Sequence, residues 1–556
     1  MPEGSPCLPV LCSSRSADTS IRCRSSKICP GAFLGFMNAE KELYFSLQQP
    51  HLQMSLRILI LLFLLLASLG AGMCDEAANA SAPQQVQASE ILSRMAEGGP
   101  VDYEGYTIAG DLNLSSLPGA RAKSTLSLIN CTLANASFAG VTVEKDVILA
   151  GTVFENASFD QAVFEGRAYL GASSFLAASF TGTTFRQGAV FDWTWFRGPA
   201  NFVEAQFEKD ASFNGVDFQD VNFNYSVFRS YSFFSQSRFS GDAGFSDVTF
   251  AGTSDFSSAA FRRAAYFLRS RFDGGVSFED ASFAELAQFG LVKFQGLSSF
   301  GNVTFSNEAN FALARFSDAA YFSEARFLGT ALFGLTKFED IASFQKASFA
   351  GDLILKSAQI STFLMDDGRY GRDARIILND SNFDRLKVHW SEMETHVVWD
   401  PGSYLALVNN YHNLGWSKDE DDCYYQYRYL DQAHKSPGWS KAIDILAWFS
   451  CGYGVRPGYA VAWSLLTILF FALIFWRGDG IRRSARPLQG PAEQDSVPER
   501  VTFRNALFFS TMIFLSQGPI DFLPLGRNRY LVILEGIFGW LLLALFLVTL
   551  GKVMIR

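Results

Sequence analysis

The chain has 556 residues, a formal net charge of −9 and an aromatic share of 15%. This length leaves room for several domains, and the mild acidity without a basic patch excludes a nucleic-acid-binding protein. No H-x-x-x-H motif or paired-carboxylate arrangement indicates an enzyme or a metal site, so we expect no catalysis, no cofactor and no bound metal.

An apolar stretch near the N-terminus runs from Leu56 to Gly72, with one Arg at its start and small residues at its end. This pattern is typical of a secretory signal, so we predict a signal peptide at residues 54–74 that starts at Met54. A signal peptide does not normally tolerate a long leader, and we expect residues 1–53 to be a non-native upstream extension. The spacings of its four cysteines match no common metal site: Cys7, Cys12, Cys23 and Cys29.

Eight N-x-S/T sequons lie between the predicted signal and the apolar stretches near the C-terminus. Such sequons mark surface asparagines of exported proteins, so we predict glycosylation on an exported surface. The candidates are Asn79, Asn113, Asn130, Asn135, Asn156, Asn224, Asn302 and Asn379.

The next feature is a short apolar pattern at helical spacing from Val86 to Glu97, which stops at a Gly-Gly-Pro sequence. We predict a helix that caps the open end of a repeat domain.

Phenylalanine then recurs every eleven residues from Phe245 to Phe344, and another Phe follows each of these five residues later. The same rhythm extends with small slips back to Phe154. A repeat this regular indicates a solenoid. A helix is excluded, because five-residue spacing turns about 140° around a helix and the intervening Gly, Ser, Thr and Asp residues are poor helix formers.

We predict a right-handed quadrilateral β-helix over residues 86–400, with about 22 residues per coil and each Phe stacked on the Phe one coil below. A small residue two positions before each Phe also faces inward, as Ala265 does before Phe267. We expect a rod of about nine coils, or ~45 Å. Residues 201–400 contain no proline, which suits a chain whose backbone donors all join ladders.

The texture A-x-F-x-x-A-x-F, for instance from Ala320 to Phe327, resembles the pentapeptide-repeat family in its eleven-residue, phenylalanine-rich variant. The resemblance implies the quadrilateral β-helix and implies little about function. A soluble, DNA-mimicking member of that family would need a densely acidic rod, and the signal, the sequons and the apolar stretches all oppose that alternative.

The repeat then decays into a helical juxtamembrane module at residues 401–440. We predict helices over 403–414 and 418–434, joined at Gly415. The acidic run at 419–422 lies in the first turn of the second helix, where acids suit the helix dipole, and it lacks the ligand spacing of a calcium site.

Residues 441–556 form the predicted ion-channel-like membrane domain, with spans at about 458–476 and 530–550. Between the two spans, eight arginines outnumber five acids, so the connecting loop is expected in the cytoplasm by the positive-inside rule. This places the repeat domain outside the cytoplasm, in agreement with the signal.

From Asn505 onward the chain resembles the two-transmembrane pore domain of potassium channels. The resemblance implies a pore helix at about 505–516, and the D-x-x-P match at Asp521 and Pro524 implies a filter-like segment before an inner helix. Only one filter glycine is retained, which argues against potassium selectivity. The filter-like residues are Ser516, Gln517, Gly518, Pro519, Ile520 and Asp521. The inner-helix residues are Glu535, Gly536 and Gly539.

Two alternatives stay open in this domain. Residues 505–523 are also long enough for a third membrane helix with no pore, and Glu535 either serves the pore or only reaches the headgroups. The segment from Ser450 to Gly454 contains a literal G-Y-G. We interpret it as a helix-ending turn, because no span precedes it.

The leading hypothesis is a multi-pass cell-membrane protein with an extracytoplasmic repeat domain, working as an oligomeric, weakly selective cation pore. Its partners would be membrane lipid, a permeant ion and three further copies of the chain, since the channel resemblance implies a tetramer. That resemblance is to archaeal proteins that pair these two parts. Because the signal exports the repeat domain, the first span runs inward and the pore loop must enter from the cytoplasmic face, an inverted arrangement that resembles glutamate-receptor channels. The alternative is a non-conducting surface or interaction protein whose helices only anchor the rod.

Overall fold

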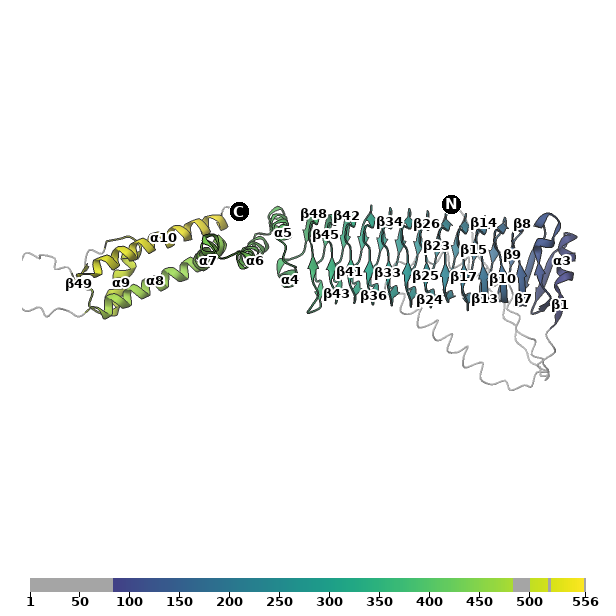
Figure 1. Ribbon diagram of the computed structural model, residues 1–556, viewed down its shortest axis with the longest axis horizontal. Coiled ribbons are helices and arrows are strands. Elements are labelled where there is room, and N and C mark those ends of the chain that lie inside the picture. The colour runs from purple at the N-terminus through teal and green to yellow at the C-terminus, as the bar shows by residue number, and fades with distance from the viewer. Residues whose placement is uncertain (1–83, 484–500, 519–521, 555–556) are drawn as a thin grey trace, which may run out of the picture. The chain divides into compact units, whose positions relative to one another are not determined.

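The computed structural model describes residues 84–483, 501–518 and 522–554. The predicted signal peptide and the extension before it lie outside these residues. The described chain forms a parallel β-solenoid followed by several helices (Figure 1). The predicted mixed fold is therefore confirmed.

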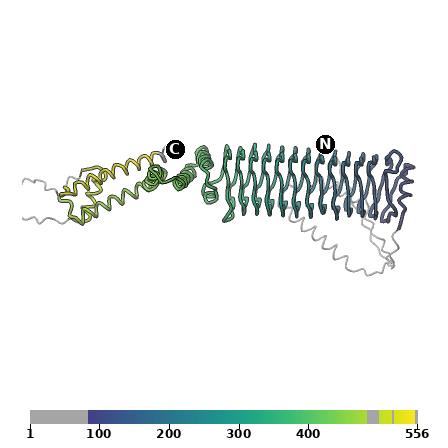
Figure 2. Tube along the Cα trace, in the orientation of Figure 1, coloured from purple at the N-terminus to yellow at the C-terminus, as the bar shows by residue number. Residues whose placement is uncertain are grey.

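The solenoid runs from β1 (Gln85–Gln87) to β48 (Asn382–Lys387) in about 14 turns (Figure 2). Its strands pair in parallel with the strands one turn before and one turn after, in two sheets of 24 strands each. Most strands have two residues. For example, β29 (Ala265–Tyr266) pairs with β33 (Ala287–Gln288), so that Ala265 lies opposite Ala287. This interval along the chain equals the predicted coil length.

Phenylalanine fills the solenoid core in vertical columns. The rings of Phe245 and Phe267 are 4.8 Å apart and parallel to within 2°. Across the core, Phe245 meets Phe256 edge to face, with ring centroids 5.6 Å apart. Ala265 and Phe267 are both fully buried, so the small residue and the large residue of each repeat face inward, as predicted.

The turn count expected from phenylalanine alone, about nine, is too low. In the first turns the inward positions hold aliphatic residues such as Leu126, Leu128 and Val147, and in the last turns they hold Leu353 and Ile376. These residues make the same inward contacts without the Phe signal. At ordinary strand spacing, 14 turns correspond to ~65 Å.

The corners of the solenoid have residues with positive φ, a conformation that could not be predicted from the sequence. A residue with positive φ recurs every eleven positions, and many of these residues are not glycine: Asp247, Ser258, Arg269, Asp280, Leu291, Asn302, Leu313, Glu324, Leu335, Lys346 and Ser357. Positive φ at the third residue of a turn is typical of type II turns, where Gly or Asn is preferred. The packed Phe columns hold other residues in this conformation as well.

Helices cover both ends of the solenoid. At the N-terminal end, α3 (Ala88–Ala96) buries Ile91 and Met95. At the C-terminal end, Asn410 of α5 (Pro401–Leu414) bonds both backbone groups of Leu386 on the last strand: Oδ1 accepts from its N–H at 2.9 Å and Nδ2 donates to its carbonyl at 2.8 Å. These hydrogen bonds pair backbone groups at the open edge of the last strand, which could otherwise pair with a strand of another chain.

The remaining elements continue from this cap toward the C-terminus. They are α4 (Trp390–Met393), α6 (Ser417–His434), α7 (Trp439–Cys451), the 3-10 turn η3 (Gly452–Gly454), α8 (Pro457–Arg477), β49 (Ile481–Arg483), α9 (Phe503–Phe514), β50 (Phe522–Pro524) and α10 (Asn528–Met554). Helices α5 and α6 match the two helices predicted for the juxtamembrane module, and Gly415 between them is left-handed, with φ 71°.

Candidate functional site

Two helices of the described chain, α8 and α10, are long and apolar enough to cross a membrane. They lie where the sequence predicts spans. Many of their large apolar side chains are exposed, for example Phe470 on α8 and Trp540 on α10. Apolar surface this extensive needs lipid or other protein around it.

A short helix, α9, packs against both of them. It has 12 residues, or ~18 Å, whereas a span needs about 20 residues. Its first residue lies beside the end of α8, because the rings of Phe503 and Trp476 are 5.7 Å apart. The structure thus has a short helix at the position of the proposed pore helix, and α9 is too short to be a third span.

The helix α9 runs back along α8 and ends beside the middle of α10. Ser510 Oγ donates to the carbonyl oxygen of Ile468 on α8 at 2.9 Å. At its C-terminal end, the carbonyl of Phe514 lies so close to Gly539 that a Cβ there would collide with it. Gly539 is eleven residues into α10, ~16 Å from the start of that helix.

Beyond α9 the chain returns to the end where α9 began. Strand β50 pairs antiparallel with β49, which closely follows α8. The backbone N–H of Leu525 donates to the carbonyl of Gly480 at 2.9 Å, and α10 begins three residues later. The segment 503–524 therefore starts and finishes at one end of the helix pair, as a re-entrant hairpin does.

The described filter-like residues, Ser516, Gln517 and Gly518, follow α9 at the inner end of this hairpin. Ser516 ends α9 in the left-handed region, with φ 58°. It is exposed together with Leu515, Gln517 and Gly518. These four consecutive residues are non-helical and uncovered. The described residues do not include Pro519, Ile520 and Asp521.

The three inner-helix residues differ in their surroundings. Glu535 faces α9 and is fully buried: Oε1 contacts Ser510 Oγ, and Oε2 has no hydrogen-bond partner among the described residues. The hydroxyl of Ser510 thus joins α8, α9 and α10. Gly539 permits the close approach of α9, whereas Gly536 has open space around it.

The G-Y-G sequence forms η3, the turn between α7 and α8. Its three residues all have positive φ, of 54°, 57° and 83°, and Gly452 caps the C-terminal end of α7. Tyr453 is buried, and its hydroxyl bonds Gln432 on α6. This segment is a helix-ending turn, as we interpret it from the sequence.

One arginine ties α6 to α7 and to this turn. Arg428 Nη2 donates to Asp444 Oδ1 of α7 at 2.6 Å, and its guanidinium lies over the Tyr453 ring, 5.5 Å from the centroid. Lys435 Nζ donates to Asp444 Oδ2 at 2.6 Å. The hydrogen bond from Lys435 and the charge of Arg428 lower the pKa of Asp444.

A second arginine makes a similar contact at the start of α8. Arg456 Nη2 donates to Asp422 Oδ1 of α6 at 2.6 Å, and its guanidinium lies 5.2 Å from the Tyr425 ring centroid. The helix α6 is therefore joined to α7 by one Arg–Asp pair and to the start of α8 by another, and the arginine of each pair is stacked on a tyrosine. The sequence contains no motif that would have indicated this pairing.

The acidic run at the start of α6 has a docking role that the sequence does not reveal. Asp419 and Glu420 lie in the first turn, as expected. In addition, Asp419 Oδ1 accepts from the backbone N–H of Trp390 at 2.8 Å, which holds α4 against α6. Among the described residues, no three His, Cys, Asp or Glu side chains are grouped so as to hold a metal ion.

The sequon asparagines occupy three kinds of position. A groove on the solenoid is lined by Asn113, Asn135 and Asn156. Exposed corners with positive φ hold Asn130 and Asn302. Partly buried positions hold Asn224 and Asn379, and Asn79 lies outside the described residues.

Comparison with protein families gives a match to the model described as Pentapeptide repeats (9 copies). The matched segments are 128–174, 172–217, 196–249, 234–282, 278–325 and 313–359. No curated protein and no solved structure matches the chain. The matched segments contain none of α8, α9 and α10, so the comparisons lend no support to the likeness to potassium channels.

Proposed function

Residues 128–359 are pentapeptide repeats, and we propose that they form the extracytoplasmic part of a membrane-anchored, oligomeric, weakly selective cation pore. In this proposal α8 and α10 span the membrane, and α9 is a pore helix that enters from one face. The repeat solenoid projects from the opposite face.

The observation that carries the proposal is the uncovered backbone at the inner end of the hairpin. Residues 515–518 are exposed and non-helical, and they lie beside the middle of α10. The N–H groups of Leu515, Ser516 and Gln517 donate to carbonyls of α9, but the carbonyls of these three residues have no backbone partner among the described residues. Such backbone is not tolerated against lipid, because each unpaired C=O costs several kcal/mol there. It is tolerated where it lines a water-filled cavity or is covered by another chain, and a pore at the centre of an oligomer provides both.

The direction of α9 favours cations. Its N-terminal end lies beside the end of α8, so its C-terminal end points into the interior of the membrane. The C-terminal end of a helix carries a partial negative charge, and several such ends around an axis would attract a cation. Weak selectivity is expected because Gly518 is the one glycine retained in the filter-like segment, and the stacked carbonyl rings of a potassium filter require more.

Several copies are needed, because each chain contributes a single α9. The resemblance to potassium channels suggests four. The exposed apolar side chains of α8 and α10 are available both to neighbouring copies and to lipid.

The test is conductance of the purified full chain in planar bilayers. With Gln517→Cys at the inner end of the hairpin, a charged thiosulfonate reagent is expected to block the current. The matched control is Leu547→Cys, which is exposed on α10 beyond the reach of α9, and its current should persist. Silence over a range of voltages and ions would contradict the pore and favour the membrane-anchored interaction protein.

A further inference from the structure

A groove of about 530 Å³ crosses one face of the solenoid near its N-terminal end. It lies over β7 (Thr132–Ser137), β10 (Val153–Ser158) and β13 (Ser174–Ser179), which have six residues each instead of two. The turns here are shorter by one residue than those of the regular block, since Asn135 pairs with Asn156 and Asn156 pairs with Ala177. These shorter turns with longer strands form a continuous strip on the solenoid.

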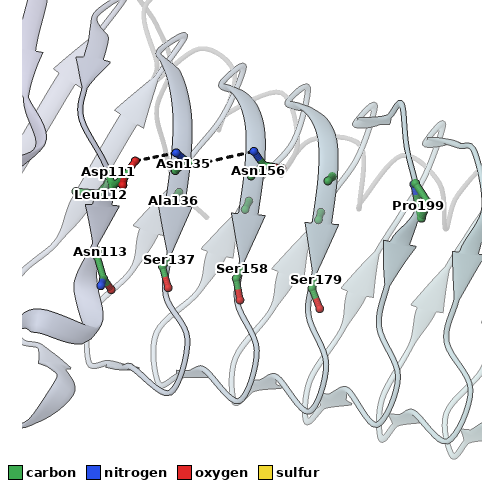
Figure 3. Close-up of a pocket in the computed structure, with 13 residues that line it drawn as sticks. Asp111, Leu112, Asn113, Asn135, Ala136, Ser137, Asn156, Ser158, Ser179 and Pro199 are labelled. Atoms are coloured by element: carbon green, nitrogen blue, oxygen red, sulfur yellow. Dashed lines mark hydrogen bonds between the residues drawn. The ribbon is translucent and has the colours of Figure 1, made fainter.

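The strip ends at Pro199, where the turn becomes one residue longer. Phe175 in the first half of β13 pairs with Phe196. Ala178 in the second half pairs with Ala200, an interval longer by one residue. The added residue lies at the corner beside Pro199, which bounds one end of the groove (Figure 3). Asp111 and Asn113 bound the other end.

Two rows of polar side chains border the groove, with small alanines between them (Figure 3). In one row, Asn135 Nδ2 donates to Asp111 Oδ1 at 2.7 Å, and Asn156 Nδ2 donates to Asn135 Oδ1 at 3.2 Å. This ladder ends at Asn156, because the next strand has Ala177 at the paired position. The other row consists of Ser137, Ser158 and Ser179.

The two rows offer complementary hydrogen-bonding groups. A side-chain amide has two N–H donors, and Asn135 and Asn156 each use one within the ladder. Ser158 Oγ donates to Asp160 at 3.2 Å, and Ser179 Oγ donates to the same carboxylate. Their oxygens therefore retain acceptor capacity. A row of donors thus faces a row of acceptors, two residues or ~6.6 Å apart along the strands.

The charges of the lining residues indicate which class of ligand fits the groove. Among the residues that line the groove, Asp111 is the one with a charged side chain, and its Oδ1 already accepts from Asn135. Without lysine or arginine, the lining does not suit a polyanion. A hydroxyl group both donates and accepts, so a ligand with hydroxyls repeated along its length would satisfy both rows. We propose that this groove binds a neutral oligosaccharide, lying along the solenoid axis between the asparagine and serine rows.

Asn135 and Asn156 are also sequon asparagines. Their geometry indicates that they cannot both carry glycans and bind a ligand in the groove. Asn135 and Asn156 lie on neighbouring strands, about 4.8 Å apart, which leaves no room for two attached glycans side by side. The amide nitrogen of each is also engaged in the ladder. Binding in the groove therefore requires that both asparagines are unmodified.

The test is isothermal titration of cellohexaose and hexa-N-acetylchitohexaose into the purified full chain, with hexagalacturonate as the anionic comparison. Asn156→Ala removes one donor, and Ser158→Ala removes one acceptor. Each is expected to raise the Kd of the neutral hexasaccharide about tenfold, the effect of one hydrogen bond. Asn310→Ala is the matched control, because Asn310 lies on β37 (Ala309–Asn310) of the same sheet, far from the groove. Its Kd should not change.

Three results would overturn the proposal. They are no binding of either neutral hexasaccharide, equal affinity in the groove variants and the unsubstituted chain, and preference for hexagalacturonate. A glycan found by mass spectrometry on Asn135 or Asn156 of the protein from its native cells would also overturn it, because the groove would already be filled.

Discussion

The rings of Phe267 and Phe289, one turn apart, are parallel to within 5° and 4.8 Å from centroid to centroid. Strand spacing fixes this separation, and the ring of Phe289 stacks in the same way on Phe311, at 4.8 Å. Each inward ring therefore has a ring on either side. Because strand spacing fixes the positions of these neighbours, they cannot move together to fill a cavity.

Removing one ring should open a cavity that the column cannot close. Phe289→Ala is expected to destabilise its turns by ~3–5 kcal/mol. Glu324→Ala is the control: Glu324 is exposed at a corner, 3.6 Å from Lys346, and its loss should cost little because surface ion pairs contribute little. Amide hydrogen exchange of the full chain measures both. Equal losses at the two positions would contradict the inward assignment.

Asn410 should be essential to the C-terminal cap. Asn410→Ala leaves the buried N–H and C=O of Leu386 without partners, at a cost of about 1–3 kcal/mol for each group. The neighbouring Asn409 is exposed, so Asn409→Ala serves as a matched control and should have almost no effect. Faster hydrogen exchange in β48 with Asn410→Ala alone is the expected result. The same change with Asn409→Ala would count against the capping role.

The two glycines of α10 should respond to alanine in opposite ways. Gly539→Ala forces a Cβ against the Phe514 carbonyl, and such overpacking costs ~1–3 kcal/mol. Gly536→Ala meets no neighbour and should stabilise the helix by up to ~1 kcal/mol. Thermal unfolding in detergent gives the sign of each change. If Gly539→Ala raised the melting temperature, α9 would not lie where the structure places it.

Acid should loosen the link between α6 and α7. The pKa of Asp444 is lowered in the folded chain. The contribution of its carboxylate to the free energy of unfolding is therefore fully present above the unfolded pKa of about 3.9. This contribution is lost as pH falls through the folded pKa. The stability difference between the unsubstituted chain and Asp444→Asn should therefore shrink as pH falls below about 4. Thermal unfolding from pH 6 to pH 3 measures this difference. A constant difference would contradict the charge contribution of Asp444.

The topology of the proposed pore can be tested at the C-terminus. A cysteine at residue 556, in a chain with its native cysteines replaced, should react with a membrane-impermeant maleimide on intact cells if α9 is re-entrant and α10 returns outward. The described native cysteines are buried, and burial raises the pKa of Cys131 and Cys423, which lowers their reactivity. Protection of residue 556 until lysis would refute the inverted pore.

The solenoid could be predicted because its core repeats one chemical choice. A Phe at every eleventh position, with a second Phe five residues later, identifies the coil length and the inward face, since a helix with an eleven-residue repeat needs apolar residues three and four apart. The outer turns are harder to recognise, because Leu126 and Val147 occupy the same inward positions as ordinary aliphatic residues. The groove is harder still, because it results from one residue more or less per turn near Pro199.

The contacts of the C-terminal cap and those around α9 could not be predicted from the sequence, because they join residues far apart in the chain. Asn410 is an unremarkable polar residue of an amphipathic helix until Leu386 is placed beside it. Glu535 is ambiguous alone, since an acid near a helix end commonly reaches solvent, and its contact with Ser510 is specified only by the packing of three helices. Sequence patterns report periodicity within an element, whereas these pairings depend on how the elements meet.

Each turn of the solenoid contacts only the turns on either side of it. The length of the solenoid is therefore proportional to the number of its turns. Adding or removing one whole turn of the regular block would change the distance between the α3 cap and the Asn410 cap by one strand spacing, about 4.8 Å. Every type of contact would be kept. The reach of the protein from one cap to the other can therefore vary in small, equal steps without any redesign of its ends.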